Sequence, residues 1–118
     1  MNKNILVTVL VGSLFGMAAC SQKPQPIQNQ LAAQAAYIDR TVSECKAYLG
    51  GIDGIGKLKS ASNKLKANAR NRGASDADFK KGFNKAALAW SVSVGMTNKM
   101  DTCSNFVDGS YDIMMSVQ

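Results

Sequence analysis

The feature that most limits what this chain can fold into is a short apolar leader that ends at a cysteine. A basic start (MNKN) precedes an apolar run from Ile5 to Met17, and the small pair Ala18-Ala19 follows it. A helix needs about 20 apolar residues to cross a bilayer, and this run is shorter. The layout is that of a secretory signal peptide, which is removed on export. We therefore expect residues 1–19 to lie outside the fold and about 100 residues to remain for one domain.

The residues around the cleavage point, Met17-Ala18-Ala19-Cys20, resemble the lipobox of bacterial lipoproteins. That family more often has Leu where Met17 stands. The resemblance implies cleavage before Cys20, a diacylglycerol group on its sulfur and an acylated amino terminus carrying chains such as palmitate. Several acyl chains anchor a protein stably, whereas one binds only marginally. The alternative is an ordinary signal peptide with a cysteine nearby by chance.

The residue after the cysteine bears on location. In Gram-negative lipoproteins an aspartate there tends to retain the protein in the inner membrane, and this chain has Ser21. The resemblance therefore implies the outer membrane, with the domain facing the periplasm. The covalent lipid on Cys20 is the one attached group that we expect, and no other cofactor is expected.

The segment after the anchor has the composition of a linker. Residues 21–29 (SQKPQPIQN) are rich in Gln and contain two prolines. Such a stretch buries little apolar area and holds an extended backbone. We expect residues 20–29 to be a flexible tether and residues 30–118 to be the folded domain.

Amphipathic periodicity predicts that this domain is a small all-α bundle of three or four helices. The first helix is expected over residues 30–49, where apolar or small residues recur every three or four positions before Gly50-Gly51. Residues 50–56 (GGIDGIG) lack the context of a phosphate-binding loop and are expected to be a flexible turn. Residues 57–72 are expected to form the second helix. The first stripe comprises Leu31, Ala35, Ile38, Val42, Cys45 and Leu49, and the second comprises Leu58, Leu65 and Ala69, with Ala61 and Ser62 between them.

The third helix is expected to begin after Ser75, a good N-cap, and to run to about Lys99. A short strand over residues 92–96 is the alternative for its last part. The fourth helix is expected over residues 101–117, with Asp101 as its cap and Gly109 as a point where it can break. The third stripe is the heaviest in the chain and is expected to be core: Phe79, Phe83, Ala86, Ala87, Trp90 and Val94.

Two cysteines fall inside the domain, and we expect Cys45 and Cys103 to form a disulfide. Exported proteins meet an oxidising environment in which disulfides persist. The alternatives are a metal site or a reactive thiol, but the chain has no histidine and two distant thiolates make a poor zinc site. A bond that closes a loop of about 60 residues contributes about 4 kcal/mol of stability in the chain-entropy account.

No group of residues predicts catalysis or metal binding. Without histidine the usual general base is missing. Asp76 and Asp78 stand at a helix start, where carboxylates favour the positive end of the helix dipole. Asp108 and Asp112 are four residues apart and can share a helix face. We therefore expect a non-enzymatic protein.

A basic stretch is the most informative surface feature. From Lys57 to Lys85 the chain has nine basic residues and two acidic ones. A basic surface attracts anionic partners, which in the periplasm are an acidic protein, an anionic envelope polymer or anionic lipid, and not nucleic acid. The alternative is a solvated face whose lysine stems pack along the apolar stripe. The candidate partner-binding residues are Lys57, Lys59, Lys64, Lys66, Arg70 and Arg72.

One short segment of the domain, residues 45–54 (CKAYLGGIDG), resembles a motif of small periplasmic immunity proteins that protect bacteria from type VI secretion effectors. Their motif runs Cys-x-x-Tyr-aliphatic-x-Gly-aliphatic-x-Asp, and Asp53 falls one position early here. The resemblance covers about ten residues and implies a helical, disulfide-bonded protein that blocks a toxin without catalysis. The matching residues are Cys45, Tyr48, Leu49, Gly51 and Ile52.

These observations favour a lipid-anchored, non-enzymatic binding module of the cell envelope. One alternative is an immunity protein that neutralises a secreted, cell-wall-degrading toxin. Another is a structural lipoprotein whose basic helix lies on anionic envelope surfaces. The sequence predicts no particular oligomeric state.

Overall fold

The computed structural model describes residues 26–117, so the predicted signal peptide, Cys20 and tether residues 21–25 lie outside the described part. No strand occurs within residues 26–117, which confirms the all-α prediction, and no helix there is long and apolar enough to span a bilayer. The elements are α3 (Ile27–Glu44), the 3₁₀ helix η1 (Lys46–Tyr48), α4 (Ile52–Asn71), α5 (Asp76–Met96) and α6 (Lys99–Ser116).

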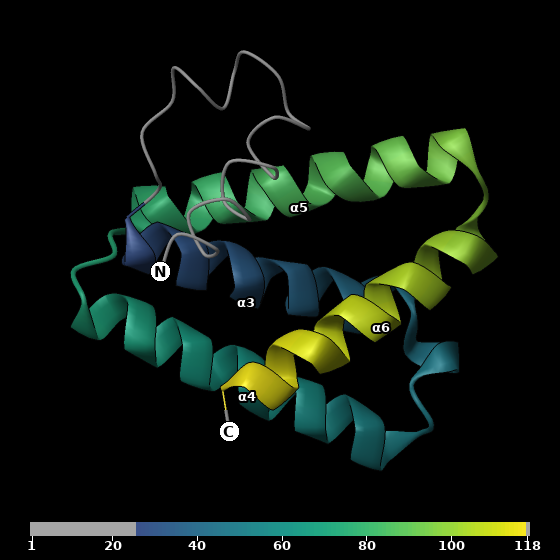
Figure 1. Ribbon diagram of the computed structural model, residues 1–118, viewed down its shortest axis with the longest axis horizontal. Coiled ribbons are helices and arrows are strands. Elements are labelled where there is room, and N and C mark those ends of the chain that lie inside the picture. The colour runs from purple at the N-terminus through teal and green to yellow at the C-terminus, as the bar shows by residue number, and fades with distance from the viewer. Residues whose placement is uncertain (1–25, 118) are drawn as a thin grey trace, which may run out of the picture.

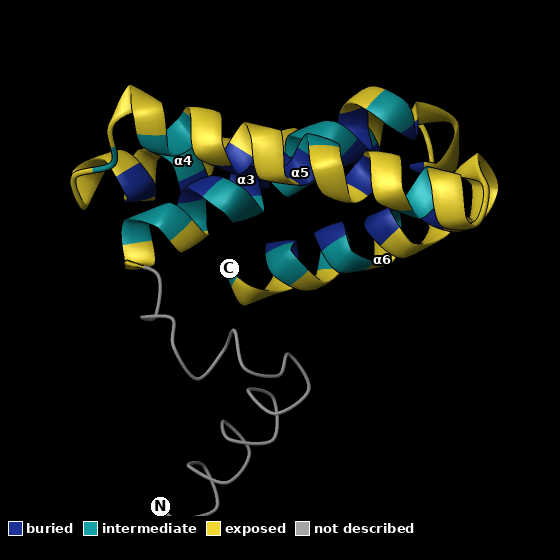
Figure 2. Cartoon of the chain, turned by 90° about the horizontal axis from the view of Figure 1, so that it is seen from above, coloured by how far each residue is buried: buried dark blue, intermediate teal, exposed yellow. Residues whose placement is uncertain are grey.

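Helix α3 is the centre of the bundle and contacts each of the other three α-helices. Helices α4 and α5 flank it, and these three form one layer (Figure 1). Helix α6 crosses α3 as a second layer, and the buried faces of the two layers meet (Figure 2). The central position of α3 explains why its buried residues run along most of its length, from Ala32 to Val42.

Two apolar clusters hold the layers together. The larger joins α3, α4 and the end of α6, and it contains the predicted residues Leu58 and Leu65, both with 0% exposure. The smaller lies where α3, α5 and α6 converge, around the predicted disulfide. Cys45 and Cys103 are bonded there with 5.5 Å between their Cα atoms, and both are fully buried. Trp90 and Phe106 complete this second cluster.

Three predicted boundaries in the first half of the domain are wrong. Helix α3 ends at Glu44 and not at residue 49, because Cys45 is its C-cap and Lys46–Tyr48 form η1. Helix α3 begins at Ile27, inside the predicted tether, because Pro26 supplies the carbonyl that accepts from the N–H of Asn29 and Gln30. Proline suits this place, since it has no N–H to leave unpaired. The glycine-rich turn is also shorter than predicted. Gly50 and Gly51 have φ values of 74° and 89°, which glycine adopts without strain, and α4 starts directly after them.

The third and fourth helices are confirmed, with shifted ends. Ser75 caps α5 as predicted: its hydroxyl accepts from the N–H of Asp78, whose carboxylate accepts from the N–H of Ser75. Helix α5 ends at Met96, without a strand. Helix α6 is capped by Asn98 and not by Asp101, because the Asn98 side chain accepts from the Asp101 N–H at 2.7 Å. Helix α6 continues through Gly109.

The predicted core face of α5 is only partly correct. Trp90 and Ala86 are buried, but Phe83 is 55% exposed. Helix α5 packs on α3 through the edge that carries Gly82, where an added Cβ would crowd the Ala32 carbonyl oxygen at 3.0 Å. This close approach turns Phe83 outward, where the Arg40 guanidinium lies 5.3 Å from the centre of its ring.

Candidate functional site

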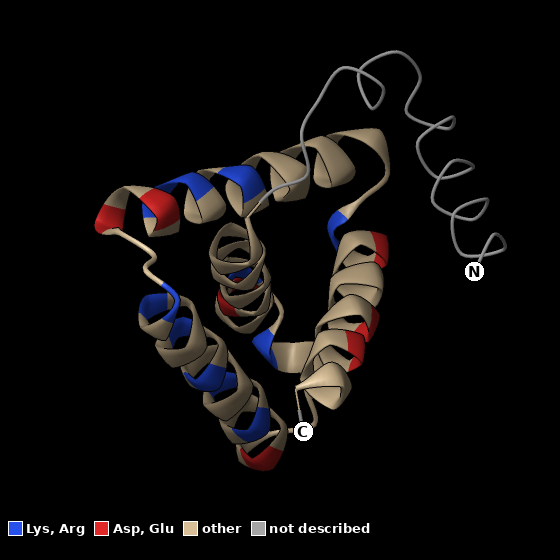
Figure 3. Ribbon diagram, turned by 60° about the vertical axis from the view of Figure 1, so that its left-hand side comes forward, with Lys and Arg blue, Asp and Glu red and all other residues tan. Residues whose placement is uncertain are grey.

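The six basic residues predicted to bind a partner lie on α4 or at its C-cap, and Figure 3 shows their positive charges along this helix. Leu58 and Leu65 anchor α4 to the core, so the basic residues fall on either side of that stripe. Lys59 and Lys66 border a shallow groove against α3 of about 420 Å³. Lys57 and Lys64 border another, against the end of α6, of about 340 Å³.

Two of the six basic residues are occupied within the molecule. The Lys66 ammonium lies 2.7 Å from the Asp39 carboxylate of α3, which also accepts a hydrogen bond of 2.6 Å from Ser62. The Arg70 guanidinium lies 3.4 Å from Asp76 and 4.5 Å from the ring centre of Phe79, both on α5. Lys66 and Arg70 therefore fasten α4 to its neighbours.

The other basic residues of this set have side chains that are exposed to solvent. Lys57, Lys59 and Lys64 are exposed, and each forms no ion pair with any residue of the described chain. Arg72 is exposed at the C-cap of α4. Of the six predicted residues, three lysines on the two sides of α4 and Arg72 at its end are therefore the ones whose charges can meet a partner.

The acidic residues of the last helix lie away from this surface. Asp101, Asp108 and Asp112 follow each other at seven and four residues along α6, a spacing that places them on one face. Figure 3 shows them as a row of negative charge on a different helix from the lysines. Negative charge is therefore gathered on α6 and positive charge on α4.

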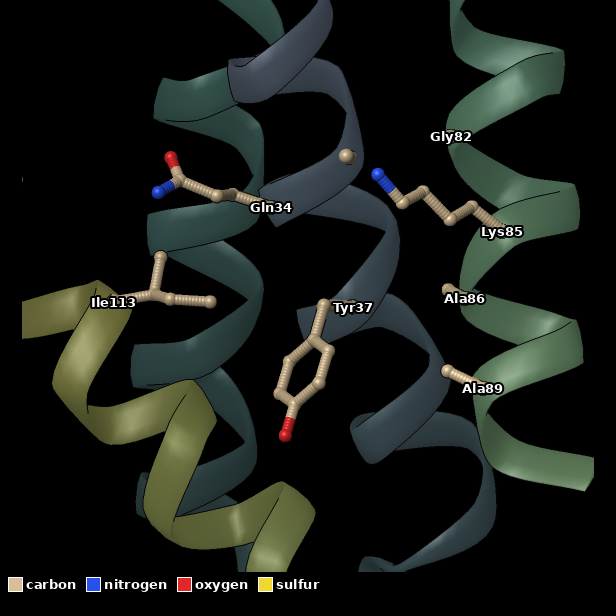
Figure 4. A pocket seen from close by; sticks show the side chains of 8 residues that line it. Gln34, Tyr37, Gly82, Lys85, Ala86, Ala89 and Ile113 are labelled. Atoms are coloured by element: carbon tan, nitrogen blue, oxygen red, sulfur yellow. The ribbon is translucent and has the colours of Figure 1, made fainter. Parts of the chain in front are cut away.

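A cleft that the sequence analysis did not anticipate lies between α3, α5 and α6. Helices α5 and α6 meet at Thr97-Asn98 and diverge from there, with α3 beside α5 and crossed by α6 (Figure 1, Figure 2). Small residues on α3 and α5 leave the space between them unfilled, and its volume is about 250 Å³. The signal in the sequence was the row of Gly82, Ala86 and Ala89 on one side of α5. The lining residues are Ala33, Gln34, Tyr37, Gly82, Lys85, Ala86, Ala89 and Ile113 (Figure 4).

Tyr37 lies at the apex of this cleft. Its ring stacks on Phe106 with 4.4 Å between ring centres, and Trp90 meets the same phenylalanine edge-on at 5.2 Å. Its hydroxyl donates a hydrogen bond of 3.4 Å to the Asn105 carbonyl. Burial, and then the negative charges of Asp108 and Asp112, raise the pKa of Tyr37, so its hydroxyl loses its proton at a higher pH than an ordinary tyrosine.

The buried hydroxyl groups have structural partners. Ser110 donates to the Thr41 hydroxyl at 2.8 Å, and Thr41 lies within hydrogen-bonding distance of the Tyr37 and Phe106 carbonyls. Ser62, beside the Asp39 carboxylate, is 1% exposed and therefore closed to a substrate. Within residues 26–117, no three Cys, Asp or Glu side chains gather to hold a metal ion.

Comparison with protein-family models, with curated protein sequences and with solved structures finds no match to this chain. Candidate functions therefore rest on the surfaces described above.

Proposed function

We propose that the protein is a lipid-anchored, non-enzymatic lipoprotein that binds an anionic polymer of the cell envelope through α4. The proposal is carried by one observation: Lys57, Lys59 and Lys64 are exposed and unpaired with any acidic group of the described chain. Ammonium groups in this state are available to carboxylates or phosphates, such as those of peptidoglycan or lipopolysaccharide.

The arrangement of the lysines favours a polymer over an acidic protein. Lys57 and Lys64 are one heptad apart, which corresponds to about 10 Å along a helix. Two charges at this spacing on one side of α4 suit successive anions of a repeating chain, and Lys59 lies on the other side. Interfaces between proteins are instead enriched in aromatic residues and arginine and depleted in lysine.

A lipid anchor on Cys20 is consistent with such a role. Six residues lie between Cys20 and the start of α3, counting Pro26, and they reach at most about 20 Å when extended. An anchor at Cys20 therefore holds the bundle close to the membrane surface and concentrates α4 beside the polymers there.

Metabolic labelling with a palmitate analogue tests the anchor. The wild-type protein is expected to take up the label and to float with membranes, whereas Cys20→Ala is expected to do neither. Cys45→Ala/Cys103→Ala is the matched control, and any of this protein that accumulates is expected to be labelled. Labelling of the Cys20→Ala protein would refute the anchor.

Cosedimentation with purified peptidoglycan sacculi, and binding to lipopolysaccharide, test the basic surface. The triple variant Lys57→Gln/Lys59→Gln/Lys64→Gln is expected to lose most of the binding of the Cys20→Ala protein. The control Lys80→Gln/Lys81→Gln/Lys99→Gln removes the same charge from other helices and is expected to retain most of it. Binding should weaken as salt rises, because exposed charges are screened. Equal losses in the two variants would reduce the effect to net charge, and capture of an acidic protein alone would favour the other partner class.

A second candidate, neutralisation of a secreted toxin, is favoured by one observation on the immunity-like segment. Cys45 and Leu49 are buried, but Tyr48 and Ile52 are 45% and 87% exposed. Exposed tyrosine and isoleucine at a corner are suited to contacting a protein. The candidate requires an effector gene beside this one and copurification of its product, which Tyr48→Ala/Ile52→Ser should abolish. An isolated gene would argue against it.

A further inference from the structure

The cleft between α3, α5 and α6 leaves apolar surface open to solvent. Its walls are formed by Ala33, Ala86, Ala89 and Ile113, with the Tyr37 ring at one end. The row through Ala89 continues along α5 to two more exposed apolar residues, Val92 at 50% and Met96 at 80%. An apolar hollow with a few polar groups at one end is the usual form of a small-molecule site.

A smaller and more polar hollow adjoins the cleft. Its volume is about 70 Å³, and it shares Ala33, Gly82 and Lys85 with the cleft. Its other lining residues are Asn29, Asp78 and Lys81. Asp78 is already engaged, because its carboxylate accepts from the Ser75 N–H at 2.8 Å. The Lys85 side chain reaches across the cleft toward α3 (Figure 4). One end of the cleft therefore carries two ammonium groups against one engaged carboxylate.

The same end holds an unmet polar atom. The side-chain oxygen of Asn29 is buried and has no hydrogen-bond partner in the described chain. A buried polar atom without a partner is costly, and this oxygen is an acceptor, so the groups that suit it are donors and not a carboxylate.

We propose that this cleft binds one medium- or long-chain fatty acid. The acyl chain lies between Ala86, Ala89 and Ile113, and the carboxylate lies at Lys81 and Lys85. Charge complementarity supports this occupant, since an apolar trough with a cationic end matches a molecule with an apolar tail and one anionic head. The volume of about 250 Å³ is below the usual range of about 300–1,000 Å³ for small-molecule pockets, which limits the occupant to a single chain.

The site is separate from the lysines of α4 and goes beyond the polymer-binding role. A partner helix is a poorer fit, because a helix is about 10–12 Å across and would place only a few side chains in the cleft. A second copy of this chain is an outcome that the experiment below distinguishes.

Calorimetric titration of the Cys20→Ala protein with octanoate, decanoate and dodecanoate tests the proposal, since no covalent acyl group then competes. Each acid is kept below its critical micelle concentration. One-to-one binding is expected, with Kd falling up to about fourfold for each added methylene and then levelling off once the chain fills the cleft. Absence of saturable binding, or a Kd independent of chain length, would overturn the proposal.

Three variants locate the ligand. Lys85→Gln is expected to raise the Kd for decanoate about tenfold, because a charged hydrogen bond is lost, whereas Lys80→Gln on the same helix leaves it unchanged. Ala89→Phe fills the cleft from an exposed position and should abolish binding, with helicity checked by circular dichroism. The uncharged 1-decanol should bind about as weakly as decanoate binds to Lys85→Gln.

The controls separate this proposal from the other occupants and from the role of α4. Lys57→Gln/Lys59→Gln/Lys64→Gln should bind decanoate normally, so failure of polymer binding leaves the fatty-acid result unaffected. Unchanged decanoate binding by Ala89→Phe would refute the cleft as the site. A dimer in sedimentation that Ala89→Phe dissociates would show that a second copy occupies the cleft, and would also refute the proposal.

Discussion

Tyr37 lies where the cleft, α3 and α6 meet, and its environment links stability to alkaline pH. Because burial and the charges of Asp108 and Asp112 raise its pKa, the folded state favours the protonated hydroxyl. The resulting stability is fully present below about pH 10, the pKa of an unfolded tyrosine. It is lost as the pH rises through the higher pKa of the folded protein.

We therefore expect the pH profile of unfolding to depend on this residue. Above about pH 10, the free energy of unfolding of the wild-type protein should fall more steeply than that of Tyr37→Phe. The absorbance difference at 295 nm between the two proteins reports the Tyr37 titration directly. Asp108→Asn should move that titration to lower pH by part of the shift, since burial is the larger cause. Asp53→Asn, on α4, is the control, and an equal movement there would contradict the assignment.

Two glycines of α4 should respond oppositely to the same substitution. A Cβ added at Gly54 would collide with the Leu49 carbonyl oxygen, whereas one added at Gly56 meets nothing within 4 Å. Gly56→Ala should raise the free energy of unfolding by up to about 1 kcal/mol, because alanine favours the helix. Gly54→Ala should lower it by about 2 kcal/mol or more, because backbone must move. Urea denaturation measures both free energies. A Gly54→Ala protein that is more stable than the wild type would contradict the close contact between residue 54 and the Leu49 carbonyl.

At the scale of elements, the sequence predicted where the helices form better than how they pack against one another. The stripe of α4 was correct because this helix buries one face, which a period of 3.6 residues reveals. The stripe of the first helix was correct as far as Val42, but Cys45 and Leu49 lie beyond the end of α3 at Glu44. The face of α5 was misjudged at Phe83, because periodicity does not show where a glycine brings two helices together. The cleft was also missed, because periodicity does not show the angle between α5 and α6 on which it depends. The spacing of the lysines correctly predicted that they lie on two sides of α4. It did not predict that Lys66 and Arg70 form ion pairs with acidic residues of α3 and α5.

The start of α5 is an element boundary whose strength can be measured. Ser75 and Asp78 satisfy each other's backbone N–H groups. Ser75→Ala removes one of these bonds and should lower the free energy of unfolding by about 1 kcal/mol. Ser60→Ala, at an exposed position inside α4, is the matched control and should change it by no more than a few tenths of a kcal/mol. If thermal melts show equal effects for the two, the cap contributes nothing to stability.

At the scale of the whole molecule, the disulfide limits how far the end of α3 and α6 can separate. Its cysteines are 58 residues apart in sequence, and the loop between them contains all of α4 and α5. The bond joins the end of α3 to α6. The two segments that carry its cysteines therefore stay together when the chain unfolds. Closing a loop of this length contributes about 4 kcal/mol in the chain-entropy account.

Reduction should therefore remove a large share of the stability of the bundle, since small domains are stable by only about 5–15 kcal/mol. With dithiothreitol present, the urea midpoint of the wild-type protein should fall to near that of Cys45→Ala/Cys103→Ala. The double variant itself should not respond to the reductant, which controls for other effects of the reagent. A wild-type midpoint that is unchanged by complete reduction would mean that the clusters around Leu58 and Phe106 hold the layers together unaided. The expected result would instead show that the bond between Cys45 and Cys103 supplies a large share of the stability of the bundle.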